Sequence, residues 1–179
     1  MTKTMLPHLE LNELHEARRH EAGFTLIELL IVMSVMLVLM TLAVPQYLKV
    51  RKTANETSAI ESIHNITAAE LSYSAAYPAN GFTCTISQLG GDPKSGAPTN
   101  QSAQLIDSAL STGQKSGYTF AVTNCNKVTV NNQDMFTSFE VTAVPQSVGK
   151  SGDNGFCSDE SSTIRKDPAG GTNCTVPMQ

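Results

Sequence analysis

The order of apolar and polar positions divides the chain into distinct parts. Between Phe24 and Val44 almost every side chain is apolar, and the exceptions are Thr25, Glu28, Ser34 and Thr41. As a helix this stretch would be about 31 Å long, which is enough to cross the hydrocarbon core of a bilayer. A buried core helix of that length would normally have a polar face, so the pattern predicts a helix inserted in a membrane.

Beyond Pro45 the pattern predicts an amphipathic continuation of the same helix. Proline removes a backbone donor, so we expect a kink or a local loosening there rather than an end. The pattern runs to about Ala76, before the breakers Pro78 and Asn80-Gly81. The second half would present an apolar stripe for a globular head to cover. That stripe comprises Tyr47, Leu48, Val50, Ala54, Ile60, Ile63, Ile66 and Leu71, among the charged residues Lys49, Arg51, Lys52, Glu56, Glu61 and Glu70.

The C-terminal part reads as loops, a short helix and several strands. A modest helical pattern over 101–110 follows Asn100, which is a good N-cap candidate. Residues 117–123 and 136–144 alternate between apolar and polar side chains, as strands with one buried face do. A short strand or hairpin arm is expected at 127–130, and a further hairpin at 156–157 and 163–166. An antiparallel sheet packed on the amphipathic half of the helix would bury both apolar faces, which predicts an α+β fold.

Composition and cysteine usage narrow the class of protein. The formal net charge is −4, so nothing indicates electrostatic binding of nucleic acid. The cysteines are Cys84, Cys125, Cys157 and Cys174; all follow the apolar stretch and none forms a CxxC pair. An even number of widely spaced cysteines after an export-type segment favours two disulfides in an oxidising compartment.

Recognisable catalytic or metal-binding motifs are absent from the sequence. Of the histidines, His8, His15 and His20 precede the apolar stretch, and only His64 follows it. A lone surface histidine is more often solvated than catalytic, since general-base work needs a positioned partner. No Cys/His cluster has zinc-site spacing, and no phosphate-binding loop or nucleophile elbow is present. We therefore expect no enzyme, no cofactor and no metal.

The flanks of the apolar stretch do not resemble an ordinary secretory signal, because no small-residue cleavage site follows Val44. The charge rule does not decide the orientation of the span. Basic residues stand on both sides of it, namely Lys3, Arg18 and Arg19 before it and Lys49, Arg51 and Lys52 after it.

The residues from Gly23 to Leu29, GFTLIEL, resemble the processing site of type IV prepilins and related pseudopilins. The resemblance implies that a membrane peptidase cuts on the cytoplasmic side between Gly23 and Phe24, and that Phe24 is then N-methylated. Glu28 becomes the fifth mature residue and Pro45 the twenty-second, where many members also have proline. The implied organisation is a cleaved leader at 1–23, a hydrophobic transmembrane and filament-core helix at 24–45, an amphipathic helix half at 46–77 and a globular pilin head at 78–179.

Glu28 is expected to act in assembly together with Phe24 and Pro45. In a bundle of apolar helices away from water, an unpaired Glu28 carboxylate would be costly, and the new amine of Phe24 is its natural partner. The pair can form within one chain or between neighbours, and the version between neighbouring chains would set the axial register of the filament. The alternative is that Glu28 only reaches back to the headgroups of the membrane. The family is understood to use this glutamate in assembly, which agrees with this interpretation.

The resemblance also bears on the disulfides. A C-terminal disulfide loop is common in pilins, so we expect Cys157–Cys174, with Cys84–Cys125 tying the post-helix loop to the sheet. The alternative pairing is Cys84–Cys174 with Cys125–Cys157.

The function implied by the resemblance is that of a major pilin, a structural subunit that polymerises into a type IV pilus for adhesion, twitching motility or DNA uptake. Its partners would be other copies of the chain, the prepilin peptidase and methylase, and the pilus assembly platform. It would be stored in the inner membrane with its N-terminus in the cytoplasm and later reach the extracellular filament. The alternatives are a pseudopilin of type II protein secretion and a membrane-anchored module that never polymerises.

Overall fold

The computed structural model describes residues 23–178. The predicted leader, residues 1–23, therefore lies outside the described residues except for Gly23. The chain divides into two compact units, of which the first ends at Ala43 and the second begins at Val44. Each unit is described by itself.

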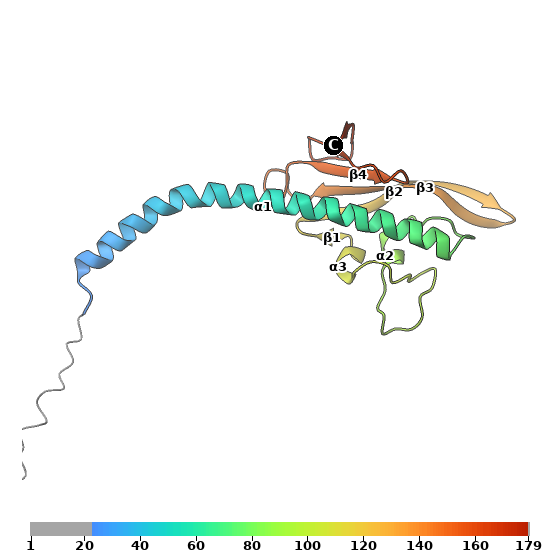
Figure 1. Cartoon of the computed structure of the whole chain (residues 1–179), viewed down its shortest axis with the longest axis horizontal. Coiled ribbons are helices and arrows are strands. Elements are labelled where there is room, and N and C mark those ends of the chain that lie inside the picture. Colours follow the sequence, from blue (N-terminus) through green and yellow to red (C-terminus); the bar gives the residue numbers. More distant parts are fainter. Residues whose placement is uncertain (1–22, 179) are drawn as a thin grey trace, which may run out of the picture. The chain divides into compact units, whose positions relative to one another are not determined.

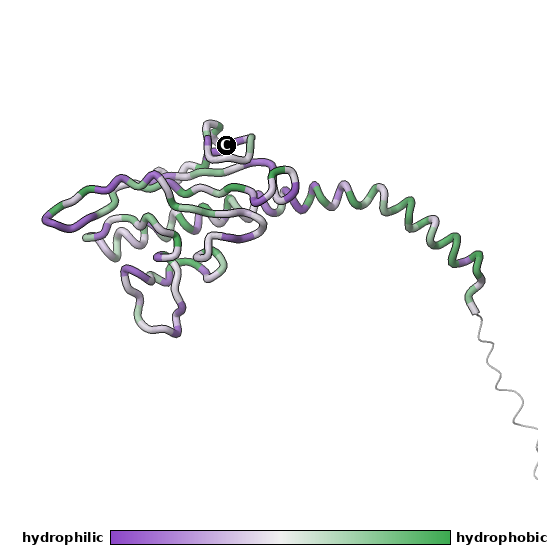
Figure 2. The backbone as a smooth tube through the Cα atoms, turned by 180° about the vertical axis from the view of Figure 1, so that it is seen from behind, coloured by the Kyte–Doolittle hydropathy of each residue, from purple (hydrophilic) through white to green (hydrophobic). Residues whose placement is uncertain are grey.

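One long helix, α1, begins at Leu26 and ends at Ala76, and Pro45 lies inside it. The predicted helix end at Ala76 is the observed one. The first part of α1 is mostly hydrophobic, with interruptions (Figure 2), and its side chains are exposed throughout. Among the described residues, α1 is the one helix long and apolar enough to cross a membrane, and its most apolar window makes no buried contacts within the chain. The predicted span is thus helical, and no other part of the described chain buries it.

The second unit contains two short helices and a six-stranded sheet. Helix α2 (Ile86–Leu89) and helix α3 (Ser108–Ser111) lie in the segment between α1 and the sheet. The strands are β1 (Gln114–Lys115), β2 (Tyr118–Val130), β3 (Gln133–Pro145), β4 (Gly155–Asp159), β5 (Arg165–Asp167) and β6 (Val176–Pro177).

The sheet is an antiparallel meander in the order β1-β2-β3-β4-β5-β6. Its centre is the long hairpin of β2 and β3 (Figure 1), which turns at Asn131 and Asn132 with φ of 52° and 61°. Positive φ at both central residues is what a two-residue hairpin turn needs, and asparagine tolerates it better than most residues. A register shift between Thr123 and Asn126 interrupts the pairing of the two strands. The sequence predicts a short strand or a hairpin arm at 127–130, and this segment is an arm of the β2–β3 hairpin, as the continuation of β2 beyond the bulge.

The core lies between the second half of α1 and the sheet. Ile63, Ile66 and Tyr73 of α1 are almost fully buried. They form one apolar cluster with the alternating inward side chains of β2 and β3, which include Tyr118, Phe120, Val122, Phe139, Val141 and Ala143. The predicted α+β arrangement, with a long helix on an antiparallel sheet, is confirmed, and it is pilin-like.

The helical stripe is covered less completely than its pattern predicted. Tyr47, Leu48 and Val50 stay exposed, as does Leu71. Glu70 was counted among the charged positions of the helix, yet its side chain is fully buried. Helical periodicity locates the buried face only to within about one residue. The apolar Leu71 is therefore exposed where burial was expected, and the charged Glu70 is buried where exposure was expected.

The helix predicted over 101–110 was wrong in extent, since only Ser108–Ser111 is helical. Backbone bonds explain the difference: the amides of Ala103 and Leu105 donate to the carbonyls of Gln88 and Leu89 at 2.8 and 2.7 Å. These bonds pair the segment with α2 instead of with itself, and Gln104 has a positive φ of 57° that a helix would not allow. The helix cap is Asp107 rather than Asn100; its carboxylate accepts from the Leu110 amide at 2.8 Å.

The loop after α1 is tied to the sheet at several points. The Phe82 amide donates to the Phe136 carbonyl, and the Phe136 amide donates to the Asn80 carbonyl, both at 3.0 Å. Gly81 lies so close that an added Cβ would stand 2.1 Å from the Phe136 oxygen, and its φ of 69° also favours glycine. A disulfide then joins Cys84 to Cys125 in the bulge of β2.

The structure pairs the cysteines as Cys84–Cys125 and Cys157–Cys174, each with a Cα–Cα distance of 5.9 Å. This is the arrangement preferred in the sequence analysis. The first disulfide closes a sequence separation of 41 residues and the second one of 17 residues. The second joins β4 to the C-terminal segment.

Removing the Cys84–Cys125 disulfide is expected to destabilise the head. A double Cys84→Ser/Cys125→Ser substitution should lower the free energy of unfolding by about 2–4 kcal/mol, because the unfolded chain regains the freedom of the closed loop. Chemical denaturation of the purified full-length chain in detergent, followed by circular dichroism, measures the change. An unfolding midpoint equal to that of the wild type would contradict a stabilising role for this bridge.

Candidate processing and assembly site

The predicted cleavage position lies in exposed, non-helical backbone. Gly23, Phe24 and Thr25 precede α1, and Phe24 is 84% exposed. A Cβ added at Gly23 would meet no atom within 4 Å. Nothing in the described chain therefore requires glycine at this position, and the peptide bond between Gly23 and Phe24 is open to a peptidase.

Glu28 caps the N-terminus of α1. Its carboxylate oxygen Oε2 accepts hydrogen bonds from the Thr25 backbone amide at 3.0 Å and from the Thr25 hydroxyl at 2.9 Å. In return the Glu28 amide donates to the Thr25 hydroxyl oxygen at 3.3 Å. Because α1 begins at Leu26, Thr25 is the N-cap and Glu28 is the third helical residue, so the pair forms a reciprocal capping box.

Thr25 was not singled out as a functional residue from the sequence, although the signal was present. A threonine followed three positions later by glutamate, at the start of an apolar run, is the capping-box pattern. The box explains how Glu28 is held before cleavage, because each bond satisfies a polar group that would otherwise be open in the first turn. Thr25 therefore holds the Glu28 carboxylate next to the backbone nitrogen of Thr25.

The remaining predicted residues lie apart from this box. Phe24 is adjacent in sequence, but in the uncut chain its nitrogen belongs to the peptide bond with Gly23, so the proposed amine does not yet exist. Pro45 lies inside α1 at the start of the second unit. Its role in assembly stays a prediction.

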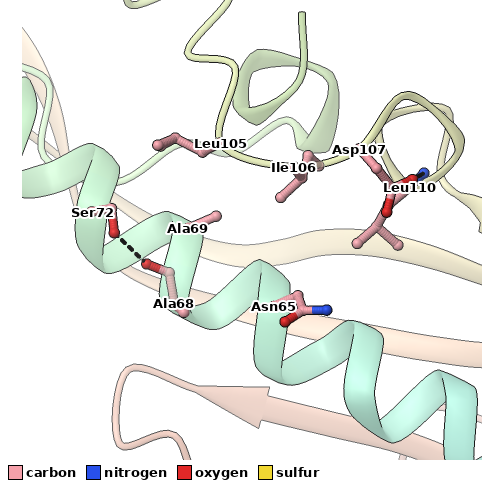
Figure 3. Close-up of a pocket in the computed structure, with 8 residues that line it drawn as sticks. All are labelled: Asn65, Ala68, Ala69, Ser72, Leu105, Ile106, Asp107 and Leu110. Carbon is pink, nitrogen blue, oxygen red and sulfur yellow. Dashed lines mark hydrogen bonds between the residues drawn. The ribbon is translucent and has the colours of Figure 1, made fainter.

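The head offers pockets but no recognisable catalytic arrangement in the part of the chain that the structure describes. One pocket of about 310 Å³ lies between α1 and the segment 105–110 (Figure 3). Its lining is Asn65, Ala68, Ala69, Ser72, Leu105, Ile106, Asp107 and Leu110. The one carboxylate there, that of Asp107, already caps α3 and pairs with Lys115 at 3.1 Å, and these bonds hold its pKa below the ordinary value. Among residues 23–178 no group of three or more His, Cys, Asp or Glu side chains could hold a metal ion.

An exposed Gly23–Phe24 bond, a capped apolar helix and an antiparallel head together resemble a precursor of the type IV pilin and pseudopilin class. Residues 18–44 match the family model described as "Prokaryotic N-terminal methylation motif". The chain therefore carries the prepilin signal of type IV pilins and pseudopilins, which implies processing by a prepilin peptidase and a membrane-anchored precursor. Proteins of this class are structural subunits rather than enzymes. No curated protein and no solved structure matches the chain.

Proposed function

We propose that this protein is a major pilin that polymerises into a type IV pilus filament. The observation that carries the proposal is the combination of a cleavable prepilin signal with an apolar helix that the rest of the chain leaves uncovered. Every described side chain from Gly23 to Val50 is exposed. Such a surface is stable in lipid and unstable in water, so it needs a bilayer before assembly and neighbouring copies afterwards.

The proposed life of the subunit follows from this requirement. The precursor is held in the inner membrane with its N-terminus in the cytoplasm, the peptidase cuts between Gly23 and Phe24, and Phe24 is methylated. An assembly platform then moves the processed chain from the bilayer into a helical homopolymer that reaches the cell exterior. Adhesion, twitching motility and DNA uptake are the roles open to such a filament.

The alternative within the same class is a pseudopilin of type II secretion, which forms a short periplasmic filament. Secretion pseudopilins often lack disulfides, so the bridges Cys84–Cys125 and Cys157–Cys174 favour a pilin. A disulfide-stabilised head suits an extracellular fibre, because exposed structures gain most from covalent closure in an oxidising medium. A tethered module that never polymerises is the remaining alternative, and it predicts an intact leader.

The proposal is tested on cells that express the wild-type chain or a Gly23 variant. We expect sheared surface material from the wild type to contain filaments by electron microscopy, built from a subunit that begins at methylated Phe24 by mass spectrometry. Gly23→Glu should abolish both, because cleavage is expected to follow the glycine of the prepilin signal, whereas the fold should be unchanged since the Gly23 Cβ direction is open. A matched substitution outside the signal, Ser95→Glu in an exposed turn, should process normally.

The result has clear opposite outcomes. Wild-type protein that remains in the membrane fraction with its leader attached would refute the proposal and favour the tethered module. Processed protein that forms only short periplasmic filaments would favour the pseudopilin.

A further inference from the structure

Basic side chains gather near the start of the second unit on two elements. Lys49 and Arg51 belong to α1, and Lys150 belongs to the loop between β3 and β4. The side-chain amide of Asn55, on α1, donates to the Ser151 backbone carbonyl at 2.8 Å, and this bond holds the loop against the helix. Segments about a hundred positions apart in the sequence thereby bring Arg51 and Lys150 to the lining of one pocket.

Two of these cations line one open pocket of about 330 Å³. Arg51 comes from the helix and Lys150 from the loop, and no carboxylate is part of the lining. The other lining residues are Asn55, Ser116, Gly117, Gln146, Ser147 and Ser151, which are glycine or carry hydroxyl and amide groups. Two cations among uncharged hydrogen-bond donors are suited to a phosphate, which arginine can bind with two parallel hydrogen bonds.

The acids of the same two segments, Glu56 and Asp153, are already engaged. Asp153 pairs with Lys52 at 2.7 Å. The Glu56 carboxylate accepts from the backbone amides of Asp153 and Asn154 at 2.7 and 3.1 Å. Within the described part of the chain, neither Arg51 nor Lys150 forms an ion pair. The charge of these two side chains is thus available for an external anion.

The position of the cluster along α1 indicates which anion it would meet. Counted from Val44 at the helical rise, Lys49 lies about 7.5 Å and Arg51 about 10 Å further along the axis. The polar headgroup layer of a bilayer is about 5–8 Å thick on each side, and long basic side chains reach back into it. Tyr47, which is 65% exposed, has the interfacial position that tyrosine favours in membrane proteins.

The charge rule adds an independent argument. Basic residues directly after a span on the translocated side oppose the insertion of that side, so they are normally depleted there. In this chain Lys49, Arg51 and Lys52 stand within eight positions of Val44. Lys52 already pairs with Asp153, and the retention of Lys49 and Arg51 on that side is accounted for if they have an anionic partner at the membrane surface.

We propose that Arg51 and Lys150 form a binding site for the phosphate of an anionic phospholipid headgroup. The site holds the head of the stored precursor at the membrane surface, and it must release its lipid when the chain is extracted. The inference requires membrane insertion only, and it does not depend on whether the chain polymerises.

The test uses the full-length chain in micelles of a neutral detergent. Equal amounts of phosphatidylglycerol and phosphatidylethanolamine are added, and the lipids that stay bound are counted by native mass spectrometry. The wild type is expected to retain phosphatidylglycerol in preference. Each cation near a lipid phosphate contributes about fivefold in affinity, so Arg51→Gln/Lys150→Gln should lose this preference by about 25-fold. The matched control Lys94→Gln/Lys127→Gln removes the same charge from other loops and strands, and it should keep the preference for phosphatidylglycerol.

All four substituted side chains belong to exposed residues, so the variants are expected to fold, and their circular dichroism checks this. Equal retention of both lipids by the wild type, or an undiminished preference in the Arg51→Gln/Lys150→Gln chain, would overturn the proposal. Loss of phosphatidylglycerol on adding an equal concentration of inorganic phosphate would show a free-phosphate site instead. Binding of a short DNA duplex in place of the lipid would also overturn the assignment.

Discussion

A Glu28→Leu chain is expected to be cut and methylated normally but to yield roughly a hundredth of the wild-type filament. In the assembled fibre this substitution leaves the Phe24 amine among apolar helices without its carboxylate. Removing one partner of a buried ion pair costs about 3–5 kcal/mol, and 3 kcal/mol is roughly a 100-fold change in an association constant. Electron microscopy and immunoblotting of the sheared fraction, with mass spectrometry of the subunit, measure both parts of the prediction.

The structure supplies a control for the loss of polarity in the span. Ser34 is also polar and exposed, but its hydroxyl donates to the Ile31 carbonyl of its own helix at 2.7 Å. Ser34→Ala should therefore assemble as the wild type does. Wild-type filament yield from Glu28→Leu would refute the proposed pair, and equal loss from both variants would show that the assay reports only changes of the apolar surface.

Thr25 allows the two roles of Glu28 to be separated. Thr25→Val removes the hydroxyl of the capping box but keeps the shape of the side chain and the Glu28 carboxylate. Loss of a helix cap costs about 0.5–2 kcal/mol, which is smaller than the loss of a buried pair. Filament yield should accordingly fall less in Thr25→Val than in Glu28→Leu, and a reversed order would assign the main role of Glu28 to capping.

Much of the architecture could be predicted because it depends on local patterns. The length of the apolar run indicates a span, and the breakers after Ala76 correctly mark the end of α1. Strict alternation in Tyr118–Val122 and Phe139–Ala143 identifies the buried face of the sheet, where these apolar side chains are found. The GFTLIEL motif predicts the processing site, and it lies within the part of the chain that matches the methylation-motif model. Each of these features depends on residues that are close together in the sequence, so no distant partner has to be known to predict it.

Features that depend on distant partners could not be predicted. The segment 101–110 has a helical pattern, but its amides bond to carbonyls near Leu89, and nothing in the pattern shows that neighbour. The phosphate pocket combines Arg51 with Lys150, which only the folded head brings together. Glu70 looked like any other charged residue of an amphipathic helix, and only the path of the following loop makes its burial possible.

Glu70 owes its burial to one partner on that loop. Its carboxylate oxygens accept from the Thr83 amide at 2.7 Å and from the Thr83 hydroxyl at 2.5 Å. These bonds fix the loop one residue before the disulfide at Cys84, so helix, loop and sheet are joined at one place. No cation pairs with Glu70 in the described part of the chain. Burial raises the pKa of Glu70 to about 7, and the two Thr83 bonds only partly offset that effect.

The head is therefore expected to lose stability as the pH rises from about 4.5 to about 7. In this window the folded chain keeps the Glu70 proton, whereas the unfolded chain, with its ordinary pKa of 4.5, releases it. Stability is full below 4.5 and falls by about 1.4 kcal/mol per pH unit, to a total of roughly 3 kcal/mol near pH 7. Denaturation of the full-length chain in neutral detergent at pH 5 and pH 8, followed by circular dichroism, measures the decline.

Other carboxylates act outside this window. Hydrogen bonds lower the pKa values of Asp107, Asp134 and Asp159 from the ordinary 3.8. What they contribute is present above pH 3.8 and is lost only as the pH falls further. Asp107 and Asp134 are also about half exposed, so their contributions are small. A decline between pH 4.5 and 7 is thus assigned to Glu70, and not to these surface groups.

Two substitutions decide whether Glu70 is the cause. Glu70→Gln can accept from the Thr83 amide and donate to the Thr83 hydroxyl, so it keeps the contact but cannot titrate. In this variant the loss of stability between pH 4.5 and 7 should vanish. Thr83→Val removes a hydrogen bond that lowers the pKa of Glu70, and its decline should therefore extend to higher pH. Glu61→Gln, which changes an exposed acid of the same helix, should behave as the wild type. A decline that persists in Glu70→Gln would place the titrating group elsewhere, and the buried carboxyl would then be only a structural tie between helix and loop.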